Sequence, residues 1–287
     1  MNKLRFACQQ LVLLLIVTIA SASPKVGHVV IISIDGGKPD VLRSSQMPTL
    51  QGLIGDSSYS WKAHTVFPNV TLPSHTSMLT GVGPNKHKIL WNSYIPKNGT
   101  VKVATIFGRA KAAGLSTAFF AAKEKFKHLN VQGTLDVFEL PSGTPGVSTA
   151  AAKYFVEHKP NLLFAHFPEA DQVGHKKGWG SNQQKDALKT VDQGIATILA
   201  AIAQAELSDD TVVIITADHG GFGWGHGLPI PANYTIPWIA IGKGVAKGQT
   251  LPDGIRTTDT AATALWLLDV QAAGLEGRPV MGAFPNL

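Results

Sequence analysis

The sequence predicts an α/β protein whose central sheet is mostly parallel and is covered by helices on both faces. Two uninterrupted runs of apolar, largely β-branched residues, 28–34 and 211–216, are typical of strands that are buried on both sides. Between such runs lie segments with helical periodicity, most clearly residues 181–206, and this alternation favours parallel strands. Aspartates and histidines follow the strands where these end, which is where open α/β sheets bind their ligands.

The first 22 residues have the composition of a secretory signal peptide. Lys3 and Arg5 precede an apolar run, and Ala20-Ser21-Ala22 offers small residues for cleavage. That run is too short to span a bilayer, and no later segment approaches the roughly 20 apolar residues that a membrane helix needs. We therefore expect a secreted or periplasmic protein without a stable membrane anchor.

Residues 23–287 are predicted to form one domain, because α/β architectures commonly reach this length around a single sheet. Cys8, the only cysteine, lies in the predicted signal peptide, so no disulfide is expected. Removing the signal lowers the formal net charge from 25 − 19 = +6 to 23 − 19 = +4, which suits an anionic substrate. The basic stretch 123–128 is predicted to be a solvent-exposed helix or loop face, and no nucleic-acid polymer is expected as a partner.

The remaining patterns place the other elements along the chain. Strands are expected at residues 28–34, 116–122, 161–167, 211–216 and 234–241. Helices are expected at residues 47–54, from Thr71 onward, and at 103–113, 146–158, 181–206 and 257–268. Residues 58–66 are predicted to be a link, and residues 83–92 a polar loop.

Thr71 stands at the start of a short predicted helix, after a turn that Pro68 and Asn69 set up. The unsatisfied N–H groups and positive dipole end of a helix favour an attacking oxyanion and a bound phosphoryl group. Taken alone, a threonine followed by Leu-Pro is far more often a helix cap than a nucleophile. Asn92 also has two interpretations, because its amide can donate to a phosphoryl oxygen or merely cap its loop.

Three segments carry aspartate or histidine beyond predicted strands. Asp35 follows the first strand and precedes two glycines, so it is either a ligand or a turn cap. Asp171 and His175 are four residues apart and would share one face of a helical turn, as a metal clasp or as a surface pair. Asp218 and His219 end the fourth strand and are followed by glycines, which is the strongest of the three signals.

His226 lies in a glycine-rich loop, where no apolar segment suggests a core position. Because the carboxyl ends of parallel strands share one edge, three aspartates, three histidines and Thr71 are expected to gather there. This mixed set of carboxylates and imidazoles suits zinc or a similar divalent ion. Six ligands exceed one tetrahedral site and divide into two sites of three.

These motifs resemble those of the nucleotide pyrophosphatase/phosphodiesterase family of the alkaline phosphatase superfamily. The matches follow the order of the family over nearly the whole chain: Ile34-Asp35-Gly36, Phe67-Pro68-Asn69 with Thr71, His87 to Asn92, Asp171 to His175, Asp218-His219-Gly220 and Gly225-His226-Gly227. Two positions depart from the pattern. Lys88 stands where a glycine is common, and Ala262 replaces a frequent proline.

The resemblance implies an alkaline-phosphatase-like fold and a metal-dependent hydrolase of phosphoric ester bonds that acts on a small phosphate ester. It assigns three ligands to each of two divalent ions, expected to be Zn²⁺: Asp171, His175 and His226 to one, and Asp35, Asp218 and His219 to the other, which Thr71 also touches. Thr71 would attack phosphorus and form a phosphothreonine intermediate that water hydrolyses. Asn92 would stabilise the equatorial oxygens.

Other functions remain open at this point. A sulfatase is excluded because a threonine cannot mature to formylglycine, but a phosphomonoesterase or a phosphonate hydrolase would use the same site. Preference for diesters is expected because the motif segments contain no arginine to clamp a doubly charged phosphate. A non-catalytic zinc-binding protein is the alternative from a different class. The pattern makes no prediction of the oligomeric state.

Overall fold

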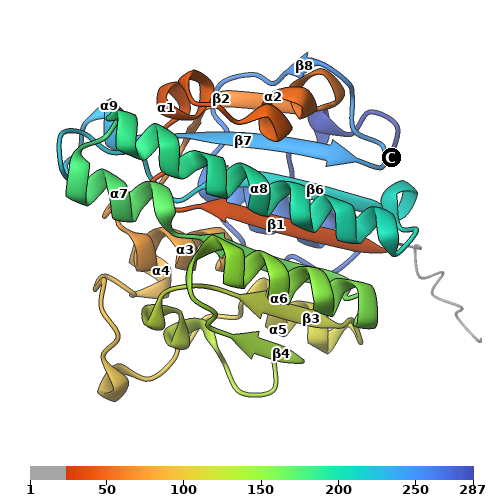
Figure 1. Ribbon diagram of the computed structural model, residues 1–287. Coiled ribbons are helices and arrows are strands. Elements are labelled where there is room, and N and C mark those ends of the chain that lie inside the picture. The colour runs from red at the N-terminus through yellow and green to blue at the C-terminus, as the bar shows by residue number, and fades with distance from the viewer. Residues whose placement is uncertain (1–23) are drawn as a thin grey trace, which may run out of the picture.

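A single eight-stranded sheet forms the centre of the computed structural model, which describes residues 24–287 (Figure 1). The predicted signal peptide, residues 1–22, therefore lies outside the described residues. Within the described part of the chain, no helix combines the length and the apolar character needed to cross a membrane.

The sheet is mixed but mostly parallel, as predicted. The strands lie in the order β4-β3-β5-β1-β6-β7-β2-β8, and β7 is antiparallel to both of its neighbours. In chain order, the strands are β1 His28–Ile34, β2 Ser58–His64, β3 Thr117–Phe120, β4 Val137–Glu139, β5 Leu162–Phe167, β6 Thr211–Ala217, β7 Thr235–Gly242 and β8 Gln249–Thr250. The five predicted strands correspond to β1, β3, β5, β6 and β7.

Helices connect the strands and cover both faces of the sheet. The α-helices are α1 Pro39–Ser44, α2 Pro48–Leu53, α3 Thr71–Thr80, α4 Pro84–His87, α5 Ile106–Ala112, α6 Gly143–His158, α7 Glu169–Lys177, α8 Asn182–Gln204, α9 Pro231–Tyr234 and α10 Thr257–Leu267. Short 3₁₀ segments are η1 Ile54–Asp56, η2 Pro96–Asn98, η3 Glu124–Leu129, η4 Ser208–Asp210 and η5 Met281–Ala283.

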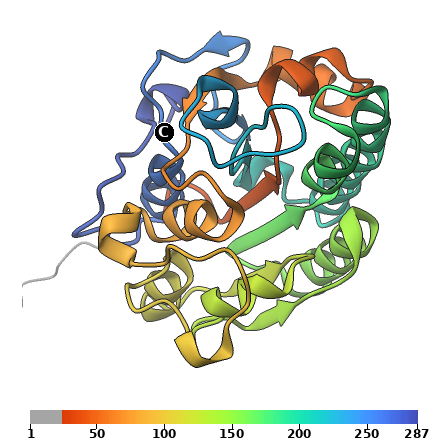
Figure 2. The same cartoon turned by 90° about the vertical axis from the view of Figure 1, so that its left-hand side faces the viewer.

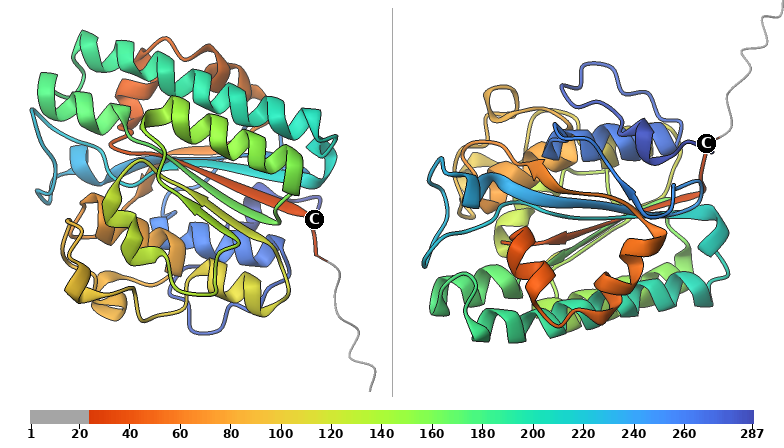
Figure 3. Two further views of the ribbon diagram at one scale, coloured as in Figure 1. Left: turned by 60° about the horizontal axis from the view of Figure 1, so that its bottom comes forward. Right: turned by 90° about the horizontal axis from the view of Figure 1, so that it is seen from above.

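Helices form one layer on each face of the sheet, which gives three layers in all (Figure 3). Two hydrophobic cores lie between the sheet and these helices, one on each face. Successive side chains of β1 alternate between them: Val29 and Ile31 pack toward α3, α5 and α10, whereas Val30 and Ile32 pack toward α2, α6 and α8. This double coverage is the physical reason why β1 is apolar throughout, and all seven of its residues are buried.

The prediction for residues 58–66 was wrong, because most of this link is strand β2. Its burial alternates, with Ser58 and Ser60 buried and Tyr59 and Trp61 partly exposed. A half-exposed strand next to the edge of a sheet lacks the continuous apolar run that identified β1. The short elements α1, β4 and β8 were also not predicted, and the 83–92 loop contains the single turn α4.

Strands β5, β1 and β6 end at the same level, which brings their following segments together. Ile34 at the end of β1 is the register partner of both Phe167 in β5 and Ala217 in β6. Figure 2 looks toward this edge of the sheet, where α3, α7 and the loop leading to α9 surround the strand ends. The edge is therefore the place to look for a site.

Candidate active site

The structure brings all six expected aspartate and histidine ligands to this edge. Asp35 follows β1 directly, Asp218 and His219 follow β6, and Asp171 and His175 lie on α7, which begins two residues after β5. The loop after β6 folds back over the strand ends and adds His226. The ligand atoms form two groups that meet at Asp171.

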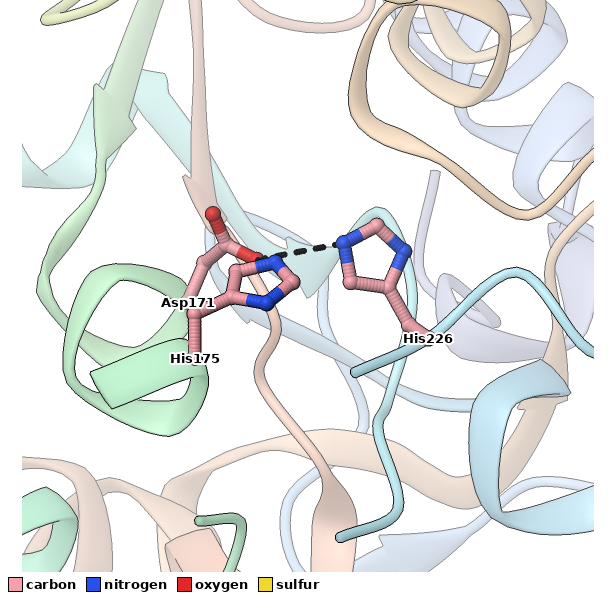
Figure 4. A group of neighbouring side chains, drawn as sticks. All are labelled: Asp171, His175 and His226. Atoms are coloured by element: carbon pink, nitrogen blue, oxygen red, sulfur yellow. Dashed lines mark ion pairs between the residues drawn. The ribbon is translucent and has the colours of Figure 1, made fainter. Parts of the chain in front are cut away.

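The first group consists of Asp171, His175 and His226 (Figure 4). Asp171 Oδ1 lies 3.3 Å from His175 Nε2 and 3.4 Å from His226 Nε2. Each imidazole donates its Nδ1 hydrogen to a backbone carbonyl, His175 to Trp224 at 2.9 Å and His226 to Asn69 at 3.1 Å. In the neutral tautomer both Nε2 lone pairs therefore face the same carboxylate oxygen, which is a favourable arrangement only with positive charge between them.

The pKa shifts of Asp171 and His175 also favour positive charge at this group. The close Asp171 carboxylate raises the pKa of His175. Burial opposes the ionisation of Asp171, yet the close imidazoles of His175 and His226 and the charge of Lys123 hold its pKa far below the usual range. The position thus stabilises a cation next to a carboxylate, whether a proton on histidine or a metal ion.

The second group surrounds His219, whose Nδ1 donates to the Gly220 carbonyl at 2.8 Å. Its Nε2 atom lies 3.5 Å from Asp35 Oδ1, 3.2 Å from Asp218 Oδ2 and 4.0 Å from Asp171 Oδ1. Burial and the charge of Asp35 raise the pKa of Asp218 well above the usual range, because two buried carboxylates repel each other here. A divalent ion would relieve that repulsion.

Buried ligand atoms without a partner provide the test of whether a metal fits. Among the residues that the structure describes, Asp35 Oδ1, Asp171 Oδ1, Asp218 Oδ2 and His219 Nε2 are buried and make no hydrogen bond. Leaving a buried polar atom unpaired costs about 1–3 kcal/mol, so four such atoms at one site require an explanation. All four are good ligand atoms for a divalent cation, and the set of carboxylates and imidazoles fits Zn²⁺.

Thr71 is the first residue of α3, and the structure does not use it as the helix cap. Val70 occupies the N-cap position, with no capping hydrogen bond from a side chain. The Thr71 backbone is tied to the site because His75 donates from Nδ1 to the Thr71 carbonyl at 2.8 Å and lies 3.4 Å from Asp218 Oδ2. Asn92 is adjacent, since its Oδ1 accepts the N–H of Leu72 at 2.9 Å.

The prediction of a solvent-exposed face at residues 123–128 was wrong for most of this stretch. The Lys123 side chain is only 14% exposed and pairs with Asp35 Oδ2 at 2.7 Å and Asp171 Oδ2 at 2.5 Å. Phe126 and His128 are fully buried. The segment follows β3, which neighbours β5, so the parallel sheet delivers it to the same edge as the ligands. Its place after a predicted strand was the signal that could have identified it.

His166 is the other site residue that the sequence analysis did not single out. It lies near the end of β5, and its Nε2 donates to Asp35 Oδ2 at 2.7 Å. Together with Lys123 it occupies Oδ2 of Asp35, which leaves Oδ1 as the free ligand atom. A histidine within the apolar run 162–167 was the available signal, because a buried histidine requires a polar partner.

Comparison with solved structures identifies the fold as alkaline-phosphatase-like. Murine ectonucleotide pyrophosphatase/phosphodiesterase 5, solved as an inactive threonine-to-alanine variant in complex with AMP, aligns with a TM-score of 0.75 and 15% identity over 87% of this chain and 97% of that one. A 2-O GAG sulfatase aligns with a TM-score of 0.73 and 14% identity over 90% of this chain and 74% of that one. The architecture is thus shared by proteins named for two different ester-cleaving activities.

The chain belongs to the type I phosphodiesterase/nucleotide pyrophosphatase family, whose model matches residues 29–222. Mouse ectonucleotide pyrophosphatase/phosphodiesterase family member 7 is 25% identical over 214 residues, covering 66% of this chain and 49% of the relative. GPI ethanolamine phosphate transferase 1 of Gibberella zeae is 24% identical over 256 residues, covering 80% of this chain and 26% of the relative. The chain therefore spans about half the length of the first relative and about a quarter of the second.

Proposed function

We propose that this chain is a secreted phosphodiesterase/nucleotide pyrophosphatase that uses two divalent ions, expected to be Zn²⁺, and Thr71 as its nucleophile. Membership of the family supports the reaction class. The observation that carries the proposal is the set of four buried, unpartnered ligand atoms at the strand ends beside α3. The complex of the murine structural relative with AMP supports a small phosphate ester as the substrate.

Each residue has a defined task in this proposal. Asp171, His175 and His226 would hold one ion, and Asp35, Asp218 and His219 the other. Bound there, divalent ions would supply Lewis-acid stabilisation of charge on the phosphoryl group and on the entering and leaving oxygens. His166 and Lys123 orient Asp35 through its second oxygen.

The start of α3 would receive the phosphoryl group. The Thr71 hydroxyl loses its proton to solvent and attacks phosphorus in line, the P–O bond to the leaving group breaks, and the leaving group departs from the phosphothreonine that forms. Water then attacks phosphorus, the bond to the Thr71 oxygen breaks, that oxygen takes up a proton, and the phosphate product is released. Asn92 donates its amide hydrogens to an equatorial oxygen, because Leu72 already holds the amide oxygen on the other side.

The test is the hydrolysis of bis(p-nitrophenyl) phosphate by purified protein with its metal content measured in the same sample. We expect about two divalent ions per chain and loss of activity on chelation. Thr71→Ala should lower kcat by about 10³-fold or more without changing the metal content, and Thr71→Ser should retain part of the activity.

Thr80→Ala is the matched control. Thr80 is a buried threonine at the far end of α3 whose hydroxyl bonds only the Thr76 carbonyl in the described structure, at 2.7 Å. This variant should keep the parent kcat. Parent-like turnover by Thr71→Ala would remove Thr71 as the nucleophile, and fully active protein with fewer than two ions per chain would remove the two-metal assignment.

A further inference from the structure

Lys125 lies beside the residue that is proposed to bind the phosphoryl oxygens. Its Nζ donates to Asn92 Oδ1 at 3.0 Å, and the same oxygen accepts the N–H of Leu72 at 2.9 Å. Both partners are donors, so only the oxygen of the carboxamide can face them. The amide nitrogen of Asn92 must therefore point away from Leu72 and Lys125, with its hydrogens free for a ligand.

The two lysines of this segment differ in what neutralises them. Lys123 pairs with one carboxylate from each ligand group, Asp35 and Asp171, so its charge is compensated within the protein. Lys125 forms no ion pair with any described residue, and its only hydrogen bond there is to the neutral Asn92. Burial and repulsion from Lys123 lower the pKa of Lys125 despite the attraction of nearby aspartates. Its ammonium would therefore be stabilised by an added anion.

The packing of the neighbouring residue fixes the position of Lys125. The next residue, Phe126, is fully buried. Its ring packs edge-on against His75, with centroids 4.9 Å apart, and at a tilt against His166, with centroids 4.7 Å apart. Both imidazoles also contact proposed ligands, because His75 lies 3.4 Å from Asp218 and His166 lies 2.7 Å from Asp35. An exposed lysine that merely improves solubility would have no such anchor, and Lys125 is instead fixed relative to Asn92.

From this geometry we infer that Lys125 is a specificity-determining residue for substrates that carry a second negative charge next to the reacting phosphorus. This inference rests on the proposed function. It modifies the expectation of a diester preference, which depended on the lack of a cation near the phosphate. The second charge can lie on the phosphoryl group itself, as in a monoester dianion, or on an adjacent phosphate, as in a nucleoside triphosphate.

The experiment compares three substrates with metal-loaded parent and Lys125→Gln protein. Methyl p-nitrophenyl phosphate carries one negative charge, p-nitrophenyl phosphate has the same leaving group and a second charge on phosphorus, and ATP has its additional charge on the leaving group. An equal loss of kcat/KM for all three substrates would show only that the orientation of Asn92 is disturbed. We expect kcat/KM for at least one of the two more highly charged substrates to fall about 10- to 100-fold further than for the methyl diester, because one charge-assisted hydrogen bond is lost. The substrate whose kcat/KM falls shows whether the second charge lies on the reacting phosphoryl group or on an adjacent phosphate.

Direct binding provides a second readout that does not need turnover. The dissociation constant of inorganic phosphate, measured by calorimetry on metal-loaded protein, should rise about 10-fold or more in Lys125→Gln and stay within a few-fold of the parent value in Lys125→Arg. Lys127→Gln is the matched control, because Lys127 lies on the same 3₁₀ segment but is 42% exposed and paired with Glu124. It should change neither the substrate ratios nor phosphate binding.

Two results overturn the inference: equal losses on all three substrates, or unchanged phosphate affinity in Lys125→Gln together with an unchanged kcat/KM for ATP relative to the methyl diester. If the parent protein cleaves none of the three esters, the proposed function fails instead. Phosphate affinity in the parent and in Lys125→Gln then decides on Lys125 alone.

Discussion

His166 offers a test of how the fold prepares Asp35 to bind a metal. The side chain is fully buried, and its Nδ1 accepts the N–H of Ala122 at 3.3 Å. This contact fixes the tautomer, so Nε2 carries the hydrogen that bonds Asp35 Oδ2 at 2.7 Å. Burial lowers the pKa of His166, which keeps the imidazole neutral and the hydrogen bond intact near neutral pH. His166 is thus a positioning residue for a ligand carboxylate.

Replacing His166 by Phe keeps a ring of similar volume among Phe126 and His75 but removes the donor. Asp35 Oδ2 would retain Lys123 as its remaining partner. Outer-shell hydrogen bonds of this kind typically contribute 10- to 100-fold to metal affinity, or about 1.4–2.8 kcal/mol. We expect His166→Phe to weaken binding of the ion that Asp35 is proposed to hold by that factor and to lower kcat with it, because the carboxylate loses one of the two groups that orient it.

The assay is competition for Zn²⁺ between the protein and a chromophoric chelator, with circular dichroism to confirm folding. His28→Phe is the control: His28 is also a buried histidine bonded to a backbone carbonyl, that of Pro160 at 2.9 Å, but it stands at the opposite end of β1 from Asp35. This control should leave metal affinity unchanged. A folded His166→Phe protein with parent affinity for both ions would refute the assignment of an orienting role to His166.

Two further predictions concern the turn that contains α4. The ring of His87 is buried and contacts Ser77 and Ile89. Burial lowers the pKa of His87 from 6.5 to about 4. Neutral His87 therefore stabilises the fold above pH 6.5, and this stabilisation is lost as the pH falls toward 4. In urea unfolding of metal-free protein, the stability gap between parent and His87→Gln should therefore shrink by about 2–3 kcal/mol between pH 7.5 and 4.5; a constant gap would contradict the shifted pKa. Lys88 adopts φ = 63°, so Lys88→Gly should raise the free energy of unfolding by up to about 1 kcal/mol, whereas Asn85→Gly within the helical turn should lower it by a similar amount. Equal effects of the two glycines would show that backbone strain at Lys88 is negligible.

The sequence by itself determined the fold class and the six ligand candidates. The apolar runs at β1 and β6 are long enough to identify strands covered on both faces, and Asp35, Asp218 and His219 follow them directly. Parallel strands must place such residues at one edge, so the gathering of ligands follows from local pattern and one topological rule. Lys88 carries a local signal too, because the glycine common at this position matches the left-handed backbone that the structure shows.

Only the tertiary structure decided the roles of the residues between these motifs. Strand β2 could not be recognised from its alternating, half-exposed residues, and Thr71 could not be separated from a helix cap until Val70 was seen in the N-cap position. The sequence predicted that Lys123 and Lys125 belong to a solvent-exposed basic stretch. The local pattern does not show that β3 lies next to β5, which is what brings both lysines to the site. Burial, charge pairing and hydrogen-bond direction at these positions depend on neighbours that are distant in the chain, such as Lys123 and Asp171, which are 48 positions apart. Local periodicity predicts which face of a helix or strand is buried. Which charged side chains lie next to each other depends on the order of the strands in the sheet.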